Sequence, residues 1–174
     1  MEKKQTHVKY GFITGAIMAV LSLALYATGL SFKPGMSWVA WLTYIPFLAG
    51  VIMNAQAYSK ANDGFITFGN AFGSCFKATM IIALVIVGYS LLTIVIFPEM
   101  KERIMEMQRT EMAKNPKMTE EMIDTAISMT TKFWNVIMVA GALAGTLFMG
   151  AIFSLIGAAV AKKKDPALMT FTNN

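Results

Sequence analysis

Few side chains in this sequence are suited to acid–base, nucleophilic or metal chemistry. The chain contains one cysteine, Cys75, and one histidine, His7, which stands alone in a basic N-terminal segment. We find no nucleophile beside a base, no cluster of histidines or carboxylates, no glycine-rich phosphate loop and no zinc-ligand spacing. Cys75 is best interpreted as a small packing residue in a helix. The sequence therefore predicts no catalytic residue, no metal site, no cofactor and no enzyme activity.

Lys77 is the most unusual charged residue, because it lies between the stretch DGFITFGNAFGSCF and a long uncharged run. Thr67 is a suitable cap for a helix that begins at Phe68. Gly69, Gly73 and Lys77 are spaced by four residues and share one face of that helix. The lysine stem can then lie across Gly73 and place its ammonium among the lipid headgroups. The alternative is a cationic groove for an acidic lipid or ligand, which makes Lys77 the candidate binding residue.

The segment 98–132 raises a copper hypothesis, because it holds seven methionines and thioether sulfurs are suitable ligands for Cu(I). No cysteine or histidine accompanies them, and their spacing is that of apolar stripes on helices. The expected stripes are Met100, Ile104 and Met107 in the first half, and Met118, Met122, Ala126 and Met129 in the second. We therefore favour packing or partner contact over metal binding.

The same segment predicts a helical hairpin. Asn115-Pro116 interrupts the helical pattern, and Thr119 can cap a second helix. The hairpin either extends the neighbouring membrane spans outward or lies on the membrane surface. Its two helices either pack on each other or present a flexible methionine-rich face to a partner.

The sequence contains four long uncharged runs, and Lys77 and the segment 98–132 lie next to them. The composition is 56% hydrophobic and only 14% charged, whereas soluble domains are nearer a quarter charged. A helix needs about 20 apolar residues to cross a bilayer. We predict an all-α membrane protein with a single domain over residues 1–174 and spans at about 10–32, 36–58, 68–97 and 133–161. Pro46 is expected to kink the second span, and the first run is too long for a cleaved signal peptide.

Small residues recur at spacing four in these runs and predict close helix packing. The positions are Gly11 and Gly15, Gly69 and Gly73, Gly141 and Gly145, with Gly150 and Ser154 continuing the last stripe. Packing within one bundle is the simpler interpretation, and homodimerisation through one face is the alternative.

The distribution of charge predicts the orientation. With four spans, both termini lie on one side, and that side carries basic residues close to the spans, whereas the charges of the other side balance. The basic residues are Lys3, Lys4, Lys9, Lys60, Lys77, Lys162, Lys163 and Lys164. Because such residues favour the cytoplasmic side, both termini are predicted in the cytoplasm and the hairpin outside. Trp38, Trp41 and Trp134 mark the opposite interface. The net charge of +5 does not suggest nucleic acid.

The order of these parts resembles a family of bacterial membrane proteins, domain of unknown function 4199, found mainly in Bacteroidetes. The sharpest match is GFITFGNAF, in which residues 64–69 fit a pattern of glycine, aromatic, Ile, Ser/Thr, Phe and Gly. The resemblance implies a bacterial cytoplasmic-membrane location and this fold, but no activity.

The expected function is therefore a structural or partner-binding one, with the outer hairpin as the contact surface. The expected partners are the lipid bilayer, a membrane or periplasmic protein, and a second copy of the chain. The alternative is an oligomeric transporter or channel for a small solute. No Asp or Glu lies inside any span, although proton-coupled pumps need an ionisable group at membrane depth.

Overall fold

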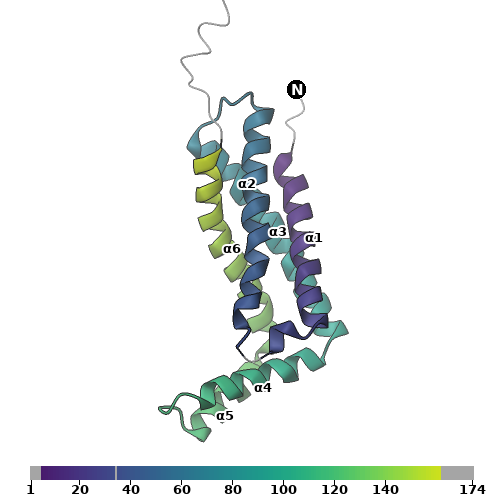
Figure 1. Ribbon diagram of the computed structural model, residues 1–174, viewed down its shortest axis with the longest axis vertical. Coiled ribbons are helices and arrows are strands. Elements are labelled where there is room, and N and C mark those ends of the chain that lie inside the picture. The colour runs from purple at the N-terminus through teal and green to yellow at the C-terminus, as the bar shows by residue number, and fades with distance from the viewer. Residues whose placement is uncertain (1–4, 34, 162–174) are drawn as a thin grey trace, which may run out of the picture.

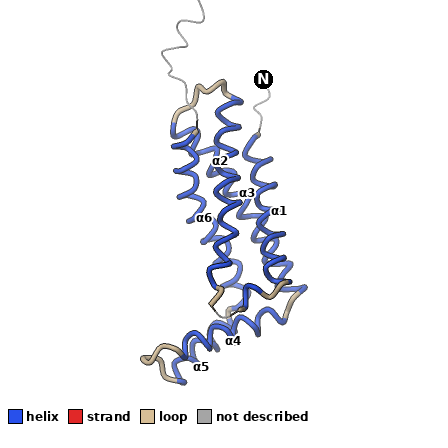
Figure 2. Tube along the Cα trace, viewed as in Figure 1, coloured by secondary structure: helices blue, strands red, loops and turns tan. Residues whose placement is uncertain are grey.

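The computed structural model describes residues 5–33 and 35–161, and all regular structure in these ranges is helical (Figures 1 and 2). The long helices are α1 (Thr6–Ala27), α2 (Tyr44–Ala61), α3 (Phe68–Ile96), α4 (Glu99–Ala113), α5 (Glu120–Lys132) and α6 (Trp134–Val160). Two short 3-10 helices, η1 (Leu30–Phe32) and η2 (Ser37–Thr43), join α1 to α2. The lysines at 3, 4 and 162–164, which contribute to the predicted orientation, lie outside the described residues.

Four helical segments are long and apolar enough to cross a membrane, as the sequence predicted: Thr6–Ala27, Trp38–Ala61, Phe68–Ile96 and Trp134–Val160. No more than 28% of the most apolar window of any of them is buried inside the protein. Most of their apolar side chains therefore face outward, as expected of helices whose solvent is lipid.

The first span ends earlier than predicted. Helix α1 stops at Ala27 because the Thr28 hydroxyl donates to the Ala24 carbonyl (2.9 Å) and Gly29 takes a left-handed conformation (φ 67°). A glycine in this conformation commonly ends a helix. The 22 residues of α1 still measure about 33 Å at the helical rise, enough for the hydrocarbon core.

The predicted kink at Pro46 is wrong. Helix α2 begins at Tyr44, so Pro46 lies in its first turn, after the 3-10 helix η2. The first turn of a helix has backbone N–H groups without an intrahelical partner, and a proline there removes no hydrogen bond. Pro46 therefore marks the start of an α-helix rather than a bend within one.

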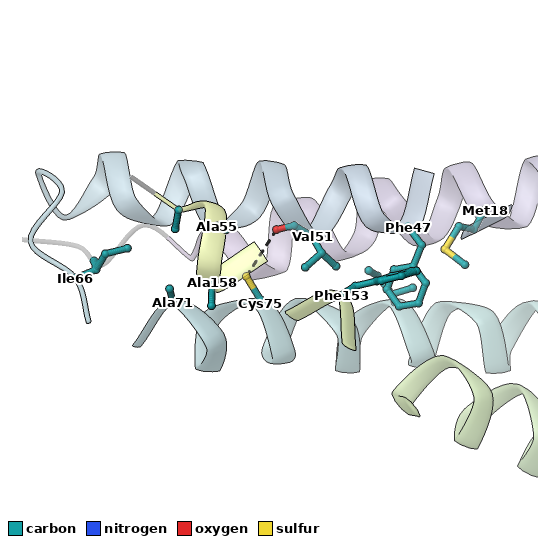
Figure 3. Close-up of a cluster of buried hydrophobic side chains, with 11 residues drawn as sticks. Met18, Phe47, Val51, Ala55, Ile66, Ala71, Cys75, Phe153 and Ala158 are labelled. Carbon is teal, nitrogen blue, oxygen red and sulfur yellow. Dashed lines mark hydrogen bonds between the residues drawn. The ribbon is translucent and has the colours of Figure 1, made fainter. Parts of the chain in front are cut away.

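The four spans form a bundle in which α1 and α6 each pack against both α2 and α3, and α2 also packs against α3. Phe47, Val51 and Ile82 are completely buried between them. The rings of Phe47 and Phe153 meet edge to face, with centroids 5.1 Å apart (Figure 3). The centre of the core is thus where α2, α3 and α6 come together.

Helices α4 and α5 pack on each other at one end of the bundle, while α1 begins and α6 finishes at the other end (Figure 1). The predicted break falls between them at residues 114–119, and the Thr119 hydroxyl caps α5 by accepting from the Met122 N–H (3.3 Å). The hairpin crosses the end of the bundle instead of continuing the line of the spans (Figure 1).

Candidate functional site

Lys77, the candidate binding residue, lies exposed in the first half of α3. Open space surrounds Gly69 and Gly73, because a Cβ built at either residue has no neighbouring atom within 4 Å. The lysine acts electrostatically on His7 in the first turn of α1, which is another basic group. The structure therefore brings Lys77 close to a histidine, on the same helix as two glycines with open space beside them.

Part of the predicted small-residue packing is found at helix contacts. A Cβ at Gly11 would lie 2.8 Å from the Cβ of Ile81, and a Cβ at Gly15 would lie 2.8 Å from the Cβ of Val85. These two glycines let α1 approach α3 more closely than any other residue would allow.

Gly150 and Ser154 occupy the corresponding positions on α6. A Cβ at Gly150 would overlap the Thr79 methyl group and come within 3.0 Å of Phe47. Ser154 is completely buried, and its hydroxyl lies 3.4 Å from the Thr79 hydroxyl, so the two side chains form a hydrogen bond. This face of α6 therefore packs closely against α3.

The other four predicted packing glycines do not contact another helix of this chain. Gly69, Gly73, Gly141 and Gly145 have nothing within 4 Å of an added Cβ. Close packing in their place occurs at Gly50, where a Cβ would overlap Thr14, and at Gly157, where it would lie 3.2 Å from the sulfur of Cys75. Spacing identifies a smooth helix face, but the arrangement of the neighbouring helices decides which faces meet.

The core contains a polar contact between α2 and α3. Asn54 is completely buried, and its side-chain amide donates to the Ser74 hydroxyl (3.2 Å). The Cys75 thiol donates to the Val51 carbonyl at 3.7 Å, so α2 and α3 are joined twice (Figure 3). The signal was present in the sequence, because Asn54 continues the helical spacing of Phe47 and Val51. These neutral groups can link helices.

Aromatic and charged residues join the hairpin to the bundle. The Tyr26 hydroxyl at the end of α1 donates to the Glu99 carboxylate at the start of α4 (2.7 Å). The Tyr26 ring also contacts Phe97, with centroids 4.8 Å apart, and Arg103 of α4 lies over the Phe32 ring at 5.7 Å. Sequence patterns could not predict these contacts, because they join residues about seventy positions apart.

We expect this junction to respond to acid. The hydrogen bond from Tyr26, a backbone hydrogen bond and the nearby Arg103 hold the pKa of Glu99 below its ordinary value. A carboxyl group with a lowered pKa in the folded state stabilises that state above its unfolded pKa, and this stabilisation is lost as the pH falls through the lowered value. The hairpin should therefore stay docked at neutral pH and loosen in acid.

A spin-label distance between Lys117→Cys and Leu30→Cys, in a Cys75→Ser background, measures this docking. Tyr26→Phe should broaden the distance distribution already at pH 7 and should reduce its further change on acidification. If the Tyr26→Phe variant and the protein with Tyr26 give the same distance distribution at every pH, the Tyr26–Glu99 contact does not hold the hairpin against the bundle.

The hairpin packs through residues other than those expected. Met105 of α4 and Ile123 of α5 are buried, whereas Met122 and Met129 are 52% and 63% exposed. Met122 and Met129 are therefore not part of a self-packing face, whereas Met118 and Ala126 of the predicted stripe are partly buried. An ion pair between Arg109 and Asp124 also connects the two helices. We call Met122, Met129 and Phe133, which is 51% exposed, the methionine face.

The methionines of the hairpin differ in exposure, since Met105 is buried and Met122 and Met129 are exposed. Within the described ranges, no group of three or more His, Cys, Asp or Glu residues is placed to hold a metal ion.

A family model described as "Protein of unknown function (DUF4199)" matches residues 9–163. The chain belongs to the DUF4199 family. No curated protein and no solved structure matches it. The match extends across all four spans and the hairpin, so the DUF4199 region and the membrane bundle are the same unit.

The DUF4199-like stretch GFITFG forms the turn between α2 and α3. Asp63 and Gly64 both have left-handed backbone conformations, with φ of 54° and 84°. Ile66 is buried in the core, and the Thr67 hydroxyl caps α3 by accepting from the Asn70 N–H (3.2 Å), as the sequence predicted. These contacts explain the stretch as a helix-to-helix turn, without a ligand.

Proposed function

We propose that this DUF4199 protein is a non-enzymatic, multi-pass protein of the bacterial cytoplasmic membrane that binds a protein partner through its outer hairpin. The observation that carries the proposal is the exposure of the methionine face on a hairpin that stands across the end of the bundle. Exposed apolar residues on the spans are explained by lipid, but a patch outside the spans commonly marks an interaction site.

The charge of α5 favours a protein over the membrane surface as the partner. Helices that lie on membranes are typically rich in Lys and Arg on their polar face. Helix α5 instead carries Glu120, Glu121 and Asp124 against Lys132. Anionic lipid would repel this helix, whereas methionine side chains adapt readily to a protein surface.

The proposed orientation, with termini in the cytoplasm and the hairpin outside, is supported by the distribution of lysines and tryptophans. Lys9 is in the first turn of α1 and Lys60 is in the last turn of α2, at the end of the bundle opposite the hairpin, and Lys77 is in the first half of α3. Trp38, Trp41 and Trp134 belong to the hairpin end, where η2 and α6 begin. Basic residues favour the cytoplasmic side and tryptophans favour an interface.

A photoreactive amino acid at Met129 should form a discrete protein adduct in living cells. Met122→Glu should reduce that adduct by about tenfold or more, because burial of a methionine side chain contributes roughly 1.5–3 kcal/mol. Ser128→Glu is the matched control, since it adds the same charge at an exposed position of α5 outside the methionine face. The adducts are quantified by immunoblot, and the captured chain is identified by mass spectrometry.

The orientation is checked in the same cells. Lys117→Cys, in the Cys75→Ser background, should react with an impermeant maleimide on intact spheroplasts.

Two outcomes of the crosslinking experiment would contradict the proposal. Photoadducts to lipid alone would show that the hairpin lies on the membrane. Equal amounts of adduct in Met122→Glu and Ser128→Glu would show that the methionine face is not the contact surface.

The alternative proposal, a small-solute transporter or channel formed by several copies, would use polar side chains inside the bundle. Asn54, Ser74, Thr79 and Ser154 are buried polar residues of this kind. Their contacts join helices to each other, which favours a structural role for them.

A further inference from the structure

A cavity of about 130 Å³ lies where α3 ends and where α4 and α6 begin. Phe97, Trp134 and Met138 supply apolar walls, and Lys101 and Asn135 supply polar side chains. Within the described residues, neither the Lys101 ammonium nor the Asn135 amide has a hydrogen bond or an ion pair with another side chain. Lys101 is half-buried and Asn135 is exposed, so the cavity is open to its surroundings and both polar groups are accessible to a ligand.

The size and the charge of this cavity indicate a compact anion. Its volume is about 130 Å³. That is below the range of about 300–1,000 Å³ in which drug-sized ligands bind. Two acidic residues are close to Lys101 in the sequence, and neither lines the cavity. The Glu99 carboxylate accepts from the Tyr26 hydroxyl, and Glu102 is exposed. An oxyanion could accept from both Lys101 and Asn135.

The surroundings of the cavity indicate that the anion is attached to a lipid. On α3, Val95 and Ile96 are 79% and 59% exposed, and on α6, Val136 and Ile137 are 65% and 46% exposed. These apolar residues lie directly beside the cavity-lining positions in the sequence, on the lipid-facing spans. Trp134 is a residue type that favours the headgroup level of a bilayer. Acyl chains could therefore lie along α3 and α6 while a phosphate occupies the cavity.

We propose that this cavity binds the headgroup phosphate of an anionic phospholipid, with Lys101 as its counter-charge and Asn135 as a hydrogen-bond donor. A lipid headgroup and free inorganic phosphate present the same phosphate group to the cavity. The exposed apolar residues beside the cavity favour the lipid. The proposal does not depend on the hairpin having a protein partner.

Native mass spectrometry of the delipidated full chain in detergent tests the proposal. One molecule of phosphatidylglycerol should bind ahead of any others. Lys101→Gln should weaken this first binding step by about fivefold, the effect expected of one lysine near a lipid surface. Asn135→Asp, which has nearly the same shape but adds a negative charge, should weaken it further. Lys117→Gln, which removes an exposed lysine from the hairpin loop, should leave it unchanged.

Two further titrations distinguish the possible ligands. Phosphatidylcholine with the same acyl chains should bind more weakly than phosphatidylglycerol, and millimolar inorganic phosphate should not displace the lipid. Equal affinity of Lys101→Gln and the unaltered protein would overturn the proposal. Equal binding of phosphatidylcholine would remove the preference for an anionic lipid, and displacement by inorganic phosphate would show that the cavity takes a soluble anion instead.

Discussion

Replacing Gly150 by alanine should destabilise the bundle, whereas the same replacement of Gly145 should not. The Cβ added at Gly150 overlaps the Thr79 methyl group and comes within 3.0 Å of Phe47, which is completely buried. Overpacking of this kind typically costs about 1–3 kcal/mol of unfolding free energy. Alanine at Gly145 meets no atom within 4 Å and gains helix propensity of about 1 kcal/mol.

The measurement is the midpoint of thermal unfolding in a mild detergent. For a chain of this length, each kcal/mol corresponds to roughly 2–4 °C. Gly150→Ala should thus unfold several degrees below the unaltered protein, with Gly145→Ala at or above it. A larger loss in Gly145→Ala would show that α6 packs through its other face, or that this face meets a second copy of the chain.

The second large effect is expected at Asn54. Asn54→Asp introduces a carboxylate of the same shape into a completely buried position between α2 and α3. A charged residue at the centre of a membrane helix costs about 2.5–3.5 kcal/mol on insertion scales. The accompanying loss of an amide donor to Ser74 adds to that cost. We expect a strongly reduced membrane yield and the lowest unfolding temperature of the single variants considered.

Two variants separate charge from shape. Asn54→Leu keeps the volume without the charge and should cost about 1 kcal/mol, the usual net value of one hydrogen bond. Asn70→Asp adds the same charge in the exposed first turn of α3, where an acidic residue is favourable. If Asn54→Asp behaves like Asn70→Asp, then the side chain at position 54 reaches water and is not enclosed between α2 and α3.

The spans and the helix boundaries were largely predictable because they depend on local properties. A bilayer requires about 20 apolar residues in each crossing helix, and a soluble core does not. Four uncharged runs therefore identify four spans without knowledge of their neighbours. The caps at Thr67 and Thr119 are equally local, since each hydroxyl bonds to a backbone N–H three residues further along.

The early end of α1 and the start of α2 at Tyr44 were not predicted, although their causes are also local. The uncharged run continues through Gly29 and through Pro46, and hydropathy alone does not distinguish a helix from a 3-10 turn. The left-handed conformation of Gly29 and the position of Pro46 in a first turn are the features that mark these ends.

The sequence by itself determined the fold class, the number of spans, the hairpin and the near absence of groups suited to catalysis. The tertiary structure alone decided which faces meet. Gly145 and Gly150 are the same residue type on one helix, yet only Gly150 contacts a neighbour. Ile123 is buried and the adjacent Met122 is exposed, although both are apolar. For the spans, the physical reason is that apolar residues are acceptable on every side of a membrane helix, so hydrophobicity does not specify its rotation. In the hairpin, two adjacent apolar residues leave the register of the buried face open by one position. The rotation of a helix depends on shape and on contacts between distant residues, such as Tyr26 with Glu99 and Asn54 with Ser74.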